Sequence, residues 1–153
     1  MTRQNIVLVA AGGSLALLVG AFAFQYIGGL APCTLCLWQR WPHAAAVLIG
    51  LAALALPGRT LPLLGALAAL TAAVIAGFHA GVEQGWWEGL ASCAGGSIAG
   101  ISMDDLLNPA ADVAPPVRCD QIAWSFAGLS MAAWNMVISL GLASVWLLAA
   151  RKA

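Results

Sequence analysis

The chain has 153 residues, of which 62% are hydrophobic and only 8% are charged, and its formal net charge is zero. A typical soluble domain has about 25% charged residues, so this chain has too few charges to cover a soluble surface. The zero net charge gives no indication of a nucleic-acid partner. The composition excludes an ordinary soluble domain and favours an integral membrane protein that lies in a lipid bilayer.

Four long stretches of the chain lack Asp, Glu, Lys and Arg. Roughly 20 residues of helix cross a hydrocarbon core of about 30 Å, and in lipid each backbone group must be satisfied within its own segment. The sequence therefore predicts an all-α membrane protein, a four-transmembrane-helix bundle that forms a single domain over 1–153. We expect helices at roughly 5–25, 37–56, 61–82 and 124–149, and two periplasmic loops at roughly 26–36 and 83–123. The first stretch is longer than the apolar region of a signal peptide and is expected to stay as a helix.

The first of these loops leads into APCTLCLWQR at 31–40, where Cys33 and Cys36 form a C-x-x-C motif. A disulfide that closes so small a ring removes little entropy from the unfolded chain, and such motifs are typically redox-active. If the second helix begins near Cys36, the partial positive charge at its N-terminus favours a thiolate there. The motif predicts a reactive dithiol.

The second helix carries a cation, Arg40, one turn after Cys36 and on the same helix face. An ionisable residue inside a membrane is by default a functional hypothesis. The alternative is an arginine that extends to lipid headgroups beside Trp38 and Trp41. The neighbouring C-x-x-C motif favours the functional interpretation.

The third helix carries a small residue at every fourth position: Gly65, Ala69, Ala73, Gly77 and Gly81. Such a stripe lets a neighbouring helix approach closely. We expect it to pack inside a tight bundle.

The long second loop contains Cys93, Cys119 and all six acidic residues. Inside it, SIAGISMDDLLNP at 97–109 combines apolar residues with Ser102 and Asp105 in the spacing of a helix N-cap. This stretch predicts a short interfacial helix on the membrane surface.

Charge is distributed unevenly between the two sides. Arg3, Arg59, Arg151 and Lys152 lie at the termini and in the turn between the second and third helices, without any acid. Because basic residues in short segments favour the cytoplasm, we expect both termini to be cytoplasmic and all four cysteines to be extracytoplasmic. In bacteria that compartment, the periplasm, is oxidising, so disulfides persist there.

Three interpretations of the four cysteines compete. A zinc site normally has two closely spaced pairs, but Cys93 and Cys119 are 26 positions apart. Two inert structural disulfides are plausible for Cys93 and Cys119 and poor for Cys33 and Cys36. Two exchanging redox pairs fit all four cysteines, and this is the interpretation we favour.

A redox-active dithiol at the membrane must pass two electrons onward. Leu37 follows Cys36, so the C-x-x-C-H haem-attachment motif is absent from the sequence, and so is a Gly-x-Gly-x-x-Gly flavin signature. We expect the acceptor to be a membrane quinone, ubiquinone or menaquinone, with Arg40 stabilising negative charge on its carbonyl. His43 is a further candidate for quinone binding. Alternatively, His43 and His79 could ligate a b-type haem or make ordinary interfacial hydrogen bonds.

This pattern resembles the bacterial disulfide bond formation protein B (DsbB) family, which comprises quinone-dependent thiol oxidases of the inner membrane. The most specific part is Cys-x-x-Cys-x-x-x-Arg, here CTLCLWQR, and FAGLSMAAWN before and into the fourth helix is also similar. Two positions differ from some members: Gln39 stands where they carry an acid, and GVEQ at 81–84 stands where they carry a histidine.

The resemblance implies a role for each site residue. Cys36 would engage the quinone, supported by Arg40, and Cys33 would be its more exposed partner. Cys93 would form a mixed disulfide with a periplasmic thioredoxin-like dithiol oxidase of the DsbA kind. Cys119 would then be the leaving sulfur that Cys33 captures. The competing interpretations are a vitamin K epoxide reductase-like oxidoreductase and a structural membrane protein with two inert disulfides.

Overall fold

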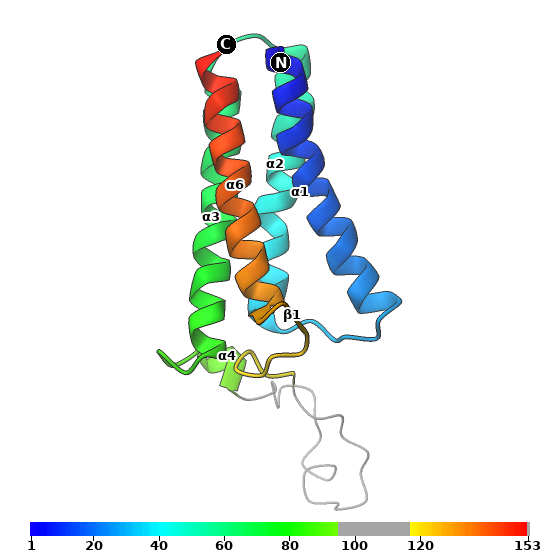
Figure 1. Ribbon diagram of the computed structural model, residues 1–153, viewed down its shortest axis with the longest axis vertical. Helices are drawn as coiled ribbons and strands as arrows, with labels where there is room; N and C mark the ends of the chain where they lie inside the picture. Colours follow the sequence, from blue (N-terminus) through cyan, green and yellow to red (C-terminus); the bar gives the residue numbers. More distant parts are fainter. Residues whose placement is uncertain (95–116, 153) are drawn as a thin grey trace, which may run out of the picture.

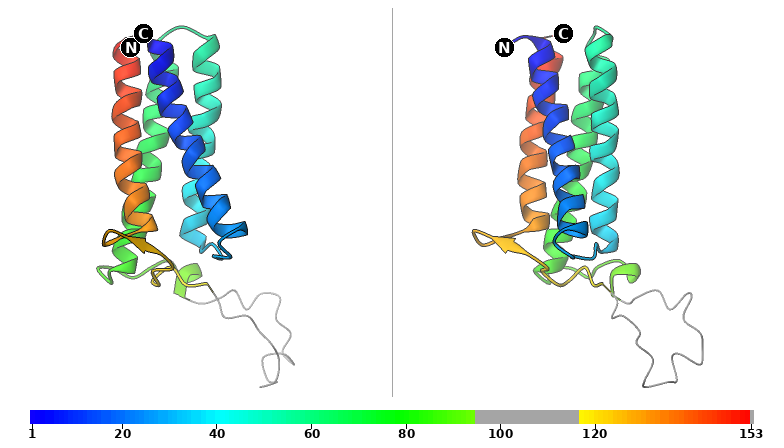
Figure 2. Two further views of the ribbon diagram at one scale, coloured as in Figure 1. Left: turned by 45° about the vertical axis from the view of Figure 1, so that its right-hand side comes forward. Right: turned by 90° about the vertical axis from the view of Figure 1, so that its right-hand side faces the viewer.

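Four long helices run side by side in one bundle in the computed structural model, which describes residues 1–94 and 117–152 (Figure 1). They are α1 (Arg3–Tyr26), α2 (Thr34–Ala55), α3 (Thr60–Glu83) and α6 (Met131–Arg151). A short helix, α4 (Ala91–Ala94), and an antiparallel hairpin of β1 (Ser125–Phe126) and β2 (Leu129–Ser130) lie at one end. Both chain termini lie at the opposite end (Figure 2). The predicted interfacial helix at 97–109 falls outside the described residues.

Side-chain caps fix the first residues of three helices. Thr2, Cys33 and Ser130 each accept a hydrogen bond from the backbone N–H three residues further on. Such a cap satisfies one of the backbone donors that the first helical turn leaves free. Cys33 therefore caps α2, which begins at Thr34 rather than near Cys36.

The last helix begins at Met131, not near 124 as expected. Ala127 and Gly128 have positive φ angles of 50° and 80°, which turn the chain back on itself. Phe126 then pairs with Leu129 and Ser125 with Ser130. The helix starts only after this hairpin because Ser130 is its cap.

Large side chains of α6 pack against the stripe of small residues on α3. The ring of the fully buried Trp146 on α6 lies where a Cβ on Gly65 would stand, with ring atoms 2.5 Å from that position. Met136, also on α6, lies 3.0 Å from the corresponding position on Gly77. Because Gly65 and Gly77 have no side chains, bulky residues of α6 pack directly onto the backbone of α3.

Three of the long helices, α1, α3 and α6, are long and apolar enough to cross a membrane. α2 has 22 residues, but its first half contains Gln39, Arg40 and His43. The outer surface of the bundle is apolar and includes the exposed side chains of Leu15, Leu51, Leu67, Val74 and Leu148. A soluble bundle presents polar residues on this surface, so the fold is that of a membrane protein.

Basic residues at the end that holds the termini bind backbone carbonyls. Arg3 donates to three carbonyl oxygens at the C-terminal end of α2 and in the turn that follows. Arg59 donates through Nε to the carbonyl of Ala150, near the end of α6. Cations are favourable at helix C-termini because the helix dipole leaves partial negative charge there.

Candidate functional site

The first cysteine pair lies at the N-terminus of α2. The Cys33 thiol donates a hydrogen bond to the Cys36 sulfur, with 2.8 Å between the sulfurs, and the Cys36 backbone N–H donates to the Cys33 sulfur at 3.2 Å. Both residues are free cysteines. The cap geometry thus brings the two sulfurs of the C-x-x-C motif into direct contact.

The second pair is joined as a disulfide between Cys93 on α4 and Cys119, with the two Cα atoms 5.0 Å apart. The backbone N–H of Cys119 also donates to the Cys93 carbonyl at 3.4 Å. These contacts tie the segment before the β-hairpin to the short helix.

The two cysteine pairs lie together. Cys33, Cys93 and Cys119 belong to one buried hydrophobic cluster, and Cys36 packs against it. Cysteines as far as 86 positions apart in the sequence are therefore packed together in the fold.

The order of exposure within the first pair is the reverse of the one that the family resemblance implies. Cys33 is only 4% exposed because it packs with the second pair, whereas Cys36 is half-buried. The hydrogen bond to Cys36 and burial both raise the pKa of the Cys33 thiol. Cys33 is thus the sheltered sulfur, and Cys36 is the accessible one.

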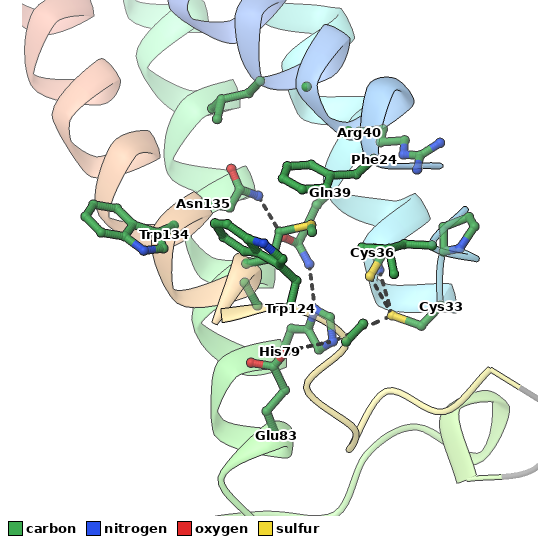
Figure 3. A pocket seen from close by; sticks show the side chains of 18 of the residues that line it. Phe24, Cys33, Cys36, Gln39, Arg40, His79, Glu83, Trp124, Trp134 and Asn135 are labelled. Carbon is green, nitrogen blue, oxygen red and sulfur yellow. Dashed lines mark hydrogen bonds and ion pairs between the residues drawn. The ribbon is translucent and has the colours of Figure 1, made fainter. Parts of the chain in front are cut away.

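A cavity of about 450 Å³ opens beside the first pair, between the helices (Figure 3). Apolar and aromatic side chains form much of its wall, among them Leu17, Phe24, Trp124 and Ile138. Its polar lining comprises Cys33, Cys36, Gln39, Arg40, His43, His79, Glu83, Arg118, Gln121 and Asn135. An apolar cavity with a few convergent polar groups is the usual form of a small-molecule site.

Arg40 is anchored at the wall of this cavity next to α1. Its Nη1 donates to Gln25 Oε1 at 2.6 Å, and the guanidinium stacks over the Phe22 ring at 4.8 Å. Its Nε atom is buried and has no hydrogen-bond partner among the described residues. The sequence prediction that Arg40 lies on the Cys36 side of α2 agrees with the lining of the cavity by both residues.

Behind the cavity, three helices are joined by a chain of buried polar side chains. From α2, Gln39 donates through Nε2 to its own-helix Leu35 carbonyl at 3.1 Å, and the same nitrogen lies 3.0 Å from His79 Nδ1 on α3. From α6, Asn135 donates to Gln39 Oε1 at 2.6 Å. The dashed lines of Figure 3 follow this path from Asn135 to His79 and on to Cys33.

The same chain continues deeper into the bundle through His43. Its Nε2 lies 3.0 Å from Asn135 Oδ1, which also accepts a hydrogen bond from Ser139 at 3.2 Å. His43 Nδ1 is buried without a hydrogen-bond partner among the described residues. His43 therefore lines the cavity through a ring whose Nε2 atom is already engaged by α6.

Glu83 lies beyond His79, where α3 ends and α6 begins. One of its carboxylate oxygens accepts a hydrogen bond from the Ser130 hydroxyl, and the other lies 3.9 Å from His79 Nε2. Ser130 is also the cap of α6, so the end of α3 is tied to the start of α6.

Cys33, Cys36 and His79 offer three possible metal ligands within 4.8 Å of one another. Two thiolates that bind one tetrahedral zinc at about 2.3 Å are roughly 3.7 Å apart, whereas the sulfurs of Cys33 and Cys36 are 2.8 Å apart. The two sulfurs are too close together to be separate ligands of one zinc ion.

The structure adds four residues to the site that were not expected there from the sequence: Gln39, Glu83, Asn135 and Ser139. The signal was present as polar pairs at i and i+4 within apolar helices: Gln39 with His43, His79 with Glu83, and Asn135 with Ser139. Each pair lies on one helix face, and polar residues inside membranes seek partners. The three pairs converge in the fold.

Comparison with known proteins agrees with the resemblance found in the sequence. A family model described as "Disulfide bond formation protein DsbB" matches residues 3–149. "Disulfide bond formation protein B" of Methylococcus capsulatus is 36% identical over 141 residues, which cover 87% of this chain and 85% of the relative. The protein of the same name from Hahella chejuensis is 30% identical over 138 residues, or 82% of this chain and 80% of the relative. No solved structure matches the chain.

Proposed function

Because the chain belongs to the DsbB family of disulfide bond formation proteins, we propose that it is a quinone-dependent thiol oxidase that reoxidises a periplasmic dithiol oxidase of the DsbA kind. The observation that carries this proposal is the packing of both cysteine pairs in one cluster, with Cys36 also lining a cavity that contains Arg40. Two pairs in contact can pass electrons in series, and the cavity provides a place for the final acceptor.

The electrons would pass through the two pairs in order. The reduced partner would attack Cys93 and release Cys119, and Cys33 would capture the Cys119 sulfur. The reduced Cys33 and Cys36 would then be reoxidised at the cavity. Thiol–disulfide exchange needs a thiolate that can reach the disulfide sulfur, and the packing of Cys33 with Cys93 and Cys119 brings the two pairs within reach of each other.

The cavity fits a quinone by its chemistry. Apolar and aromatic walls suit a ring that arrives from lipid, and Arg40 Nε and His43 Nδ1 are buried polar atoms without partners among the described residues. Ubiquinone or menaquinone, when bound, accepts two electrons and two protons. Arg40 would stabilise negative charge on a carbonyl oxygen. His43 Nε2 faces the Asn135 oxygen and carries the proton of the neutral ring, so His43 Nδ1 would accept a hydrogen bond from a hydroxyl of the reduced quinone.

The protein would lie in the bacterial inner membrane with α2 as a fourth span. Arg3 begins α1, Arg59 precedes α3, and Arg151 and Lys152 lie at the end of α6. These helix ends lie with the chain termini, and the start of α2, where Cys33 and Cys36 lie, is at the other end of the bundle (Figure 1). By the positive-inside rule, both termini would be in the cytoplasm and the cysteines in the periplasm. In a variant with all four native cysteines replaced by serine, a cysteine introduced at Thr2 should resist a membrane-impermeant maleimide in intact cells until the membrane is broken; labelling in intact cells would reverse this orientation.

The function is tested with purified protein in detergent, a reduced thioredoxin-like periplasmic oxidase and ubiquinone or menaquinone. Quinone absorbance should fall with the wild type and stay constant with Cys36→Ser or without the reduced partner. If neither quinone is consumed while both pairs remain oxidised, the cysteines are structural and Arg40 is a lipid anchor.

A further inference from the structure

His79 lies between the two cysteine pairs. Its Nε2 atom is 3.6 Å from the Cys33 sulfur, and the backbone of Cys119 also interacts with the ring. The ring is buried on α3 and cannot turn freely because Gln39 holds its other nitrogen. His79 is therefore the titratable side chain placed at the point where Cys33 and Cys119 would exchange.

The surrounding hydrogen bonds decide which ring nitrogen carries the proton. The Leu35 carbonyl can only accept, so the Gln39 side chain must present its nitrogen there, and that nitrogen also faces His79 Nδ1. The Gln39 oxygen is occupied by the Asn135 amide. His79 Nδ1 is consequently an acceptor, and in the neutral ring the proton is on Nε2, facing the Cys33 sulfur.

We propose that His79, held in its Nε2–H tautomer by Gln39, is a catalytic hydrogen-bond donor that stabilises the Cys33 thiolate when electrons pass between the two cysteine pairs. His79 contacts the reacting sulfur, and Gln39 is a positioning residue that acts through His79. The proposal rests on the proposed function for the step at which His79 acts. The interaction itself involves only the Cys33 sulfur and the His79 ring.

The transfer balances within the protein. The Cys119 thiolate attacks the Cys33 sulfur, so the Cys33–Cys119 bond forms, the Cys33–Cys36 bond breaks, and Cys36 leaves as a thiolate. The partner's second thiol displaces Cys93 from the mixed disulfide, and the Cys93 thiolate then attacks Cys119, so the Cys93–Cys119 bond forms and Cys33 leaves with the electron pair. Two electrons have moved from the second pair to the first. No further oxidant or reductant is needed.

The Cys33 thiolate released in the last step is the species that faces His79 Nε2–H. The structure has the bonding pattern of the product of this step, with Cys93 and Cys119 joined and Cys33 and Cys36 as thiols. Among the residues that the structure describes, two further ionisable groups lie by the ring and the Cys33 sulfur: Cys36, which contacts that sulfur, and Glu83, whose carboxylate lies 3.9 Å from Nε2. Asn135 reaches the ring only through Gln39 and does not titrate.

The test measures the thiolate directly. In the full-length Cys36→Ser protein, Cys33 is the only free thiol, because Cys93 and Cys119 are bonded. The ultraviolet absorbance of the thiolate, recorded against pH in detergent, gives the titration midpoint of Cys33. The Cys33→Ser, Cys36→Ser protein supplies the baseline. Retention of the Cys93–Cys119 disulfide and of helical circular dichroism confirms the fold of each variant.

Removing the donor should move this midpoint upward. In the Cys36→Ser background, His79→Leu loses the hydrogen bond to the thiolate, and we expect a rise of about one pH unit. His79→Gln is the matched control, because its amide nitrogen can donate from a similar position without titrating. We expect His79→Gln to stay close to the His79 protein. Equal midpoints for His79→Leu and the His79 protein would overturn the proposal.

Gln39 should act only through His79. Gln39→Leu removes the amide that holds the His79 proton on Nε2, so it should raise the titration midpoint of Cys33 when His79 is present. It should have no further effect once His79→Leu is present. Additive shifts would show that Gln39 acts on Cys33 independently, contrary to the proposal. Neither quinone nor partner enters this titration, so a failed quinone assay and a failed titration are separate results.

Discussion

Arg40 on α2 donates a 2.6 Å hydrogen bond to Gln25 at the end of α1, and this contact holds a cation at the wall of the cavity that Cys36 also lines. The guanidinium also stacks on Phe22 of the same helix. The cation is thus positioned by α1 while the thiols are positioned by the N-terminus of α2. The site therefore depends on the junction of these two helices.

Replacing this cation should affect the quinone step selectively. Arg40→Ala removes a charge that would face a quinone carbonyl, so the apparent KM for quinone should rise about 10-fold or more. The rate of exchange with the reduced partner should change little, because Arg40 is not in the cluster that joins the two cysteine pairs. Steady-state quinone kinetics and a partner-oxidation assay give the two readouts.

Gln25→Ala is the control for Arg40. It removes the anchor but leaves the guanidinium and its contact with Phe22, so its effect on the quinone KM should be smaller. Unchanged quinone kinetics in Arg40→Ala would remove Arg40 from the site and return it to a lipid-facing role.

The second pair gives a prediction about order. Cys119→Ser removes the sulfur that should leave when the partner attacks Cys93. Cys93 is then a free thiol, so the partner is supplied with its second cysteine replaced and its attacking cysteine carrying a small thiol as a disulfide leaving group. Cys93 displaces that small thiol, and the mixed disulfide between Cys93 and the partner, which has no Cys119 sulfur to resolve it, should accumulate on non-reducing gels. Cys93→Ser is the matched control and should give no such adduct. An adduct with Cys93→Ser, and none with Cys119→Ser, would reverse the assigned roles.

The buried polar chain should contribute to stability as well as to the site. Asn135→Leu leaves Gln39 Oε1 without its α6 partner and leaves His43 Nε2 with only the longer 3.5 Å contact to Ser139, and we expect a loss of about 1–2 kcal/mol in the free energy of unfolding. Ser144→Ala on the same helix is the control, because Ser144 bonds only to the Leu140 carbonyl one turn earlier and is exposed. Unfolding in detergent measures both. Equal effects would mean that the chain adds nothing to stability.

Because α3 and α6 approach closely, the stability of the bundle should be sensitive to an added methyl group at their contact. Gly65→Ala places a methyl group against the Trp146 ring, only 2.5 Å away, so the bundle should lose about 1–3 kcal/mol. Gly141→Ala on α6 is the matched control, since its added methyl group meets no atom within 4 Å. Thermal unfolding that ranks the two variants equally would show that this contact can relax freely.

The helices could be predicted from the sequence because apolar runs of this length have few other structures in lipid. Their ends could not be predicted as well, because they depend on single residues. Cys33 caps α2 one turn earlier than expected, and the positive φ angles of Ala127 and Gly128 delay α6 until Met131. A hydropathy pattern does not reveal such caps and turns, because each depends on one or two residues.

Only some residues of the candidate site could be predicted from the sequence. The C-x-x-C motif and the nearby arginine identified Cys33, Cys36 and Arg40. Gln39, His79 and Asn135 come from three different helices, and their contacts depend on how those helices rotate against one another. The burial of Cys33 likewise depends on the second pair, which packs against it from 60 residues or more away.

The central claim is that the two pairs act in series, and a single-turnover comparison of wild type with Cys93→Ser tests it most directly. Each protein is mixed with ubiquinone and either the reduced partner or a small dithiol, and the quinol formed is counted per dithiol oxidised. The wild type should form one quinol for each partner dithiol. Cys93→Ser should form quinol with the small dithiol, which can reduce the first pair directly, and should fail with the partner. Partner oxidation by Cys93→Ser at the wild-type rate would contradict the series arrangement.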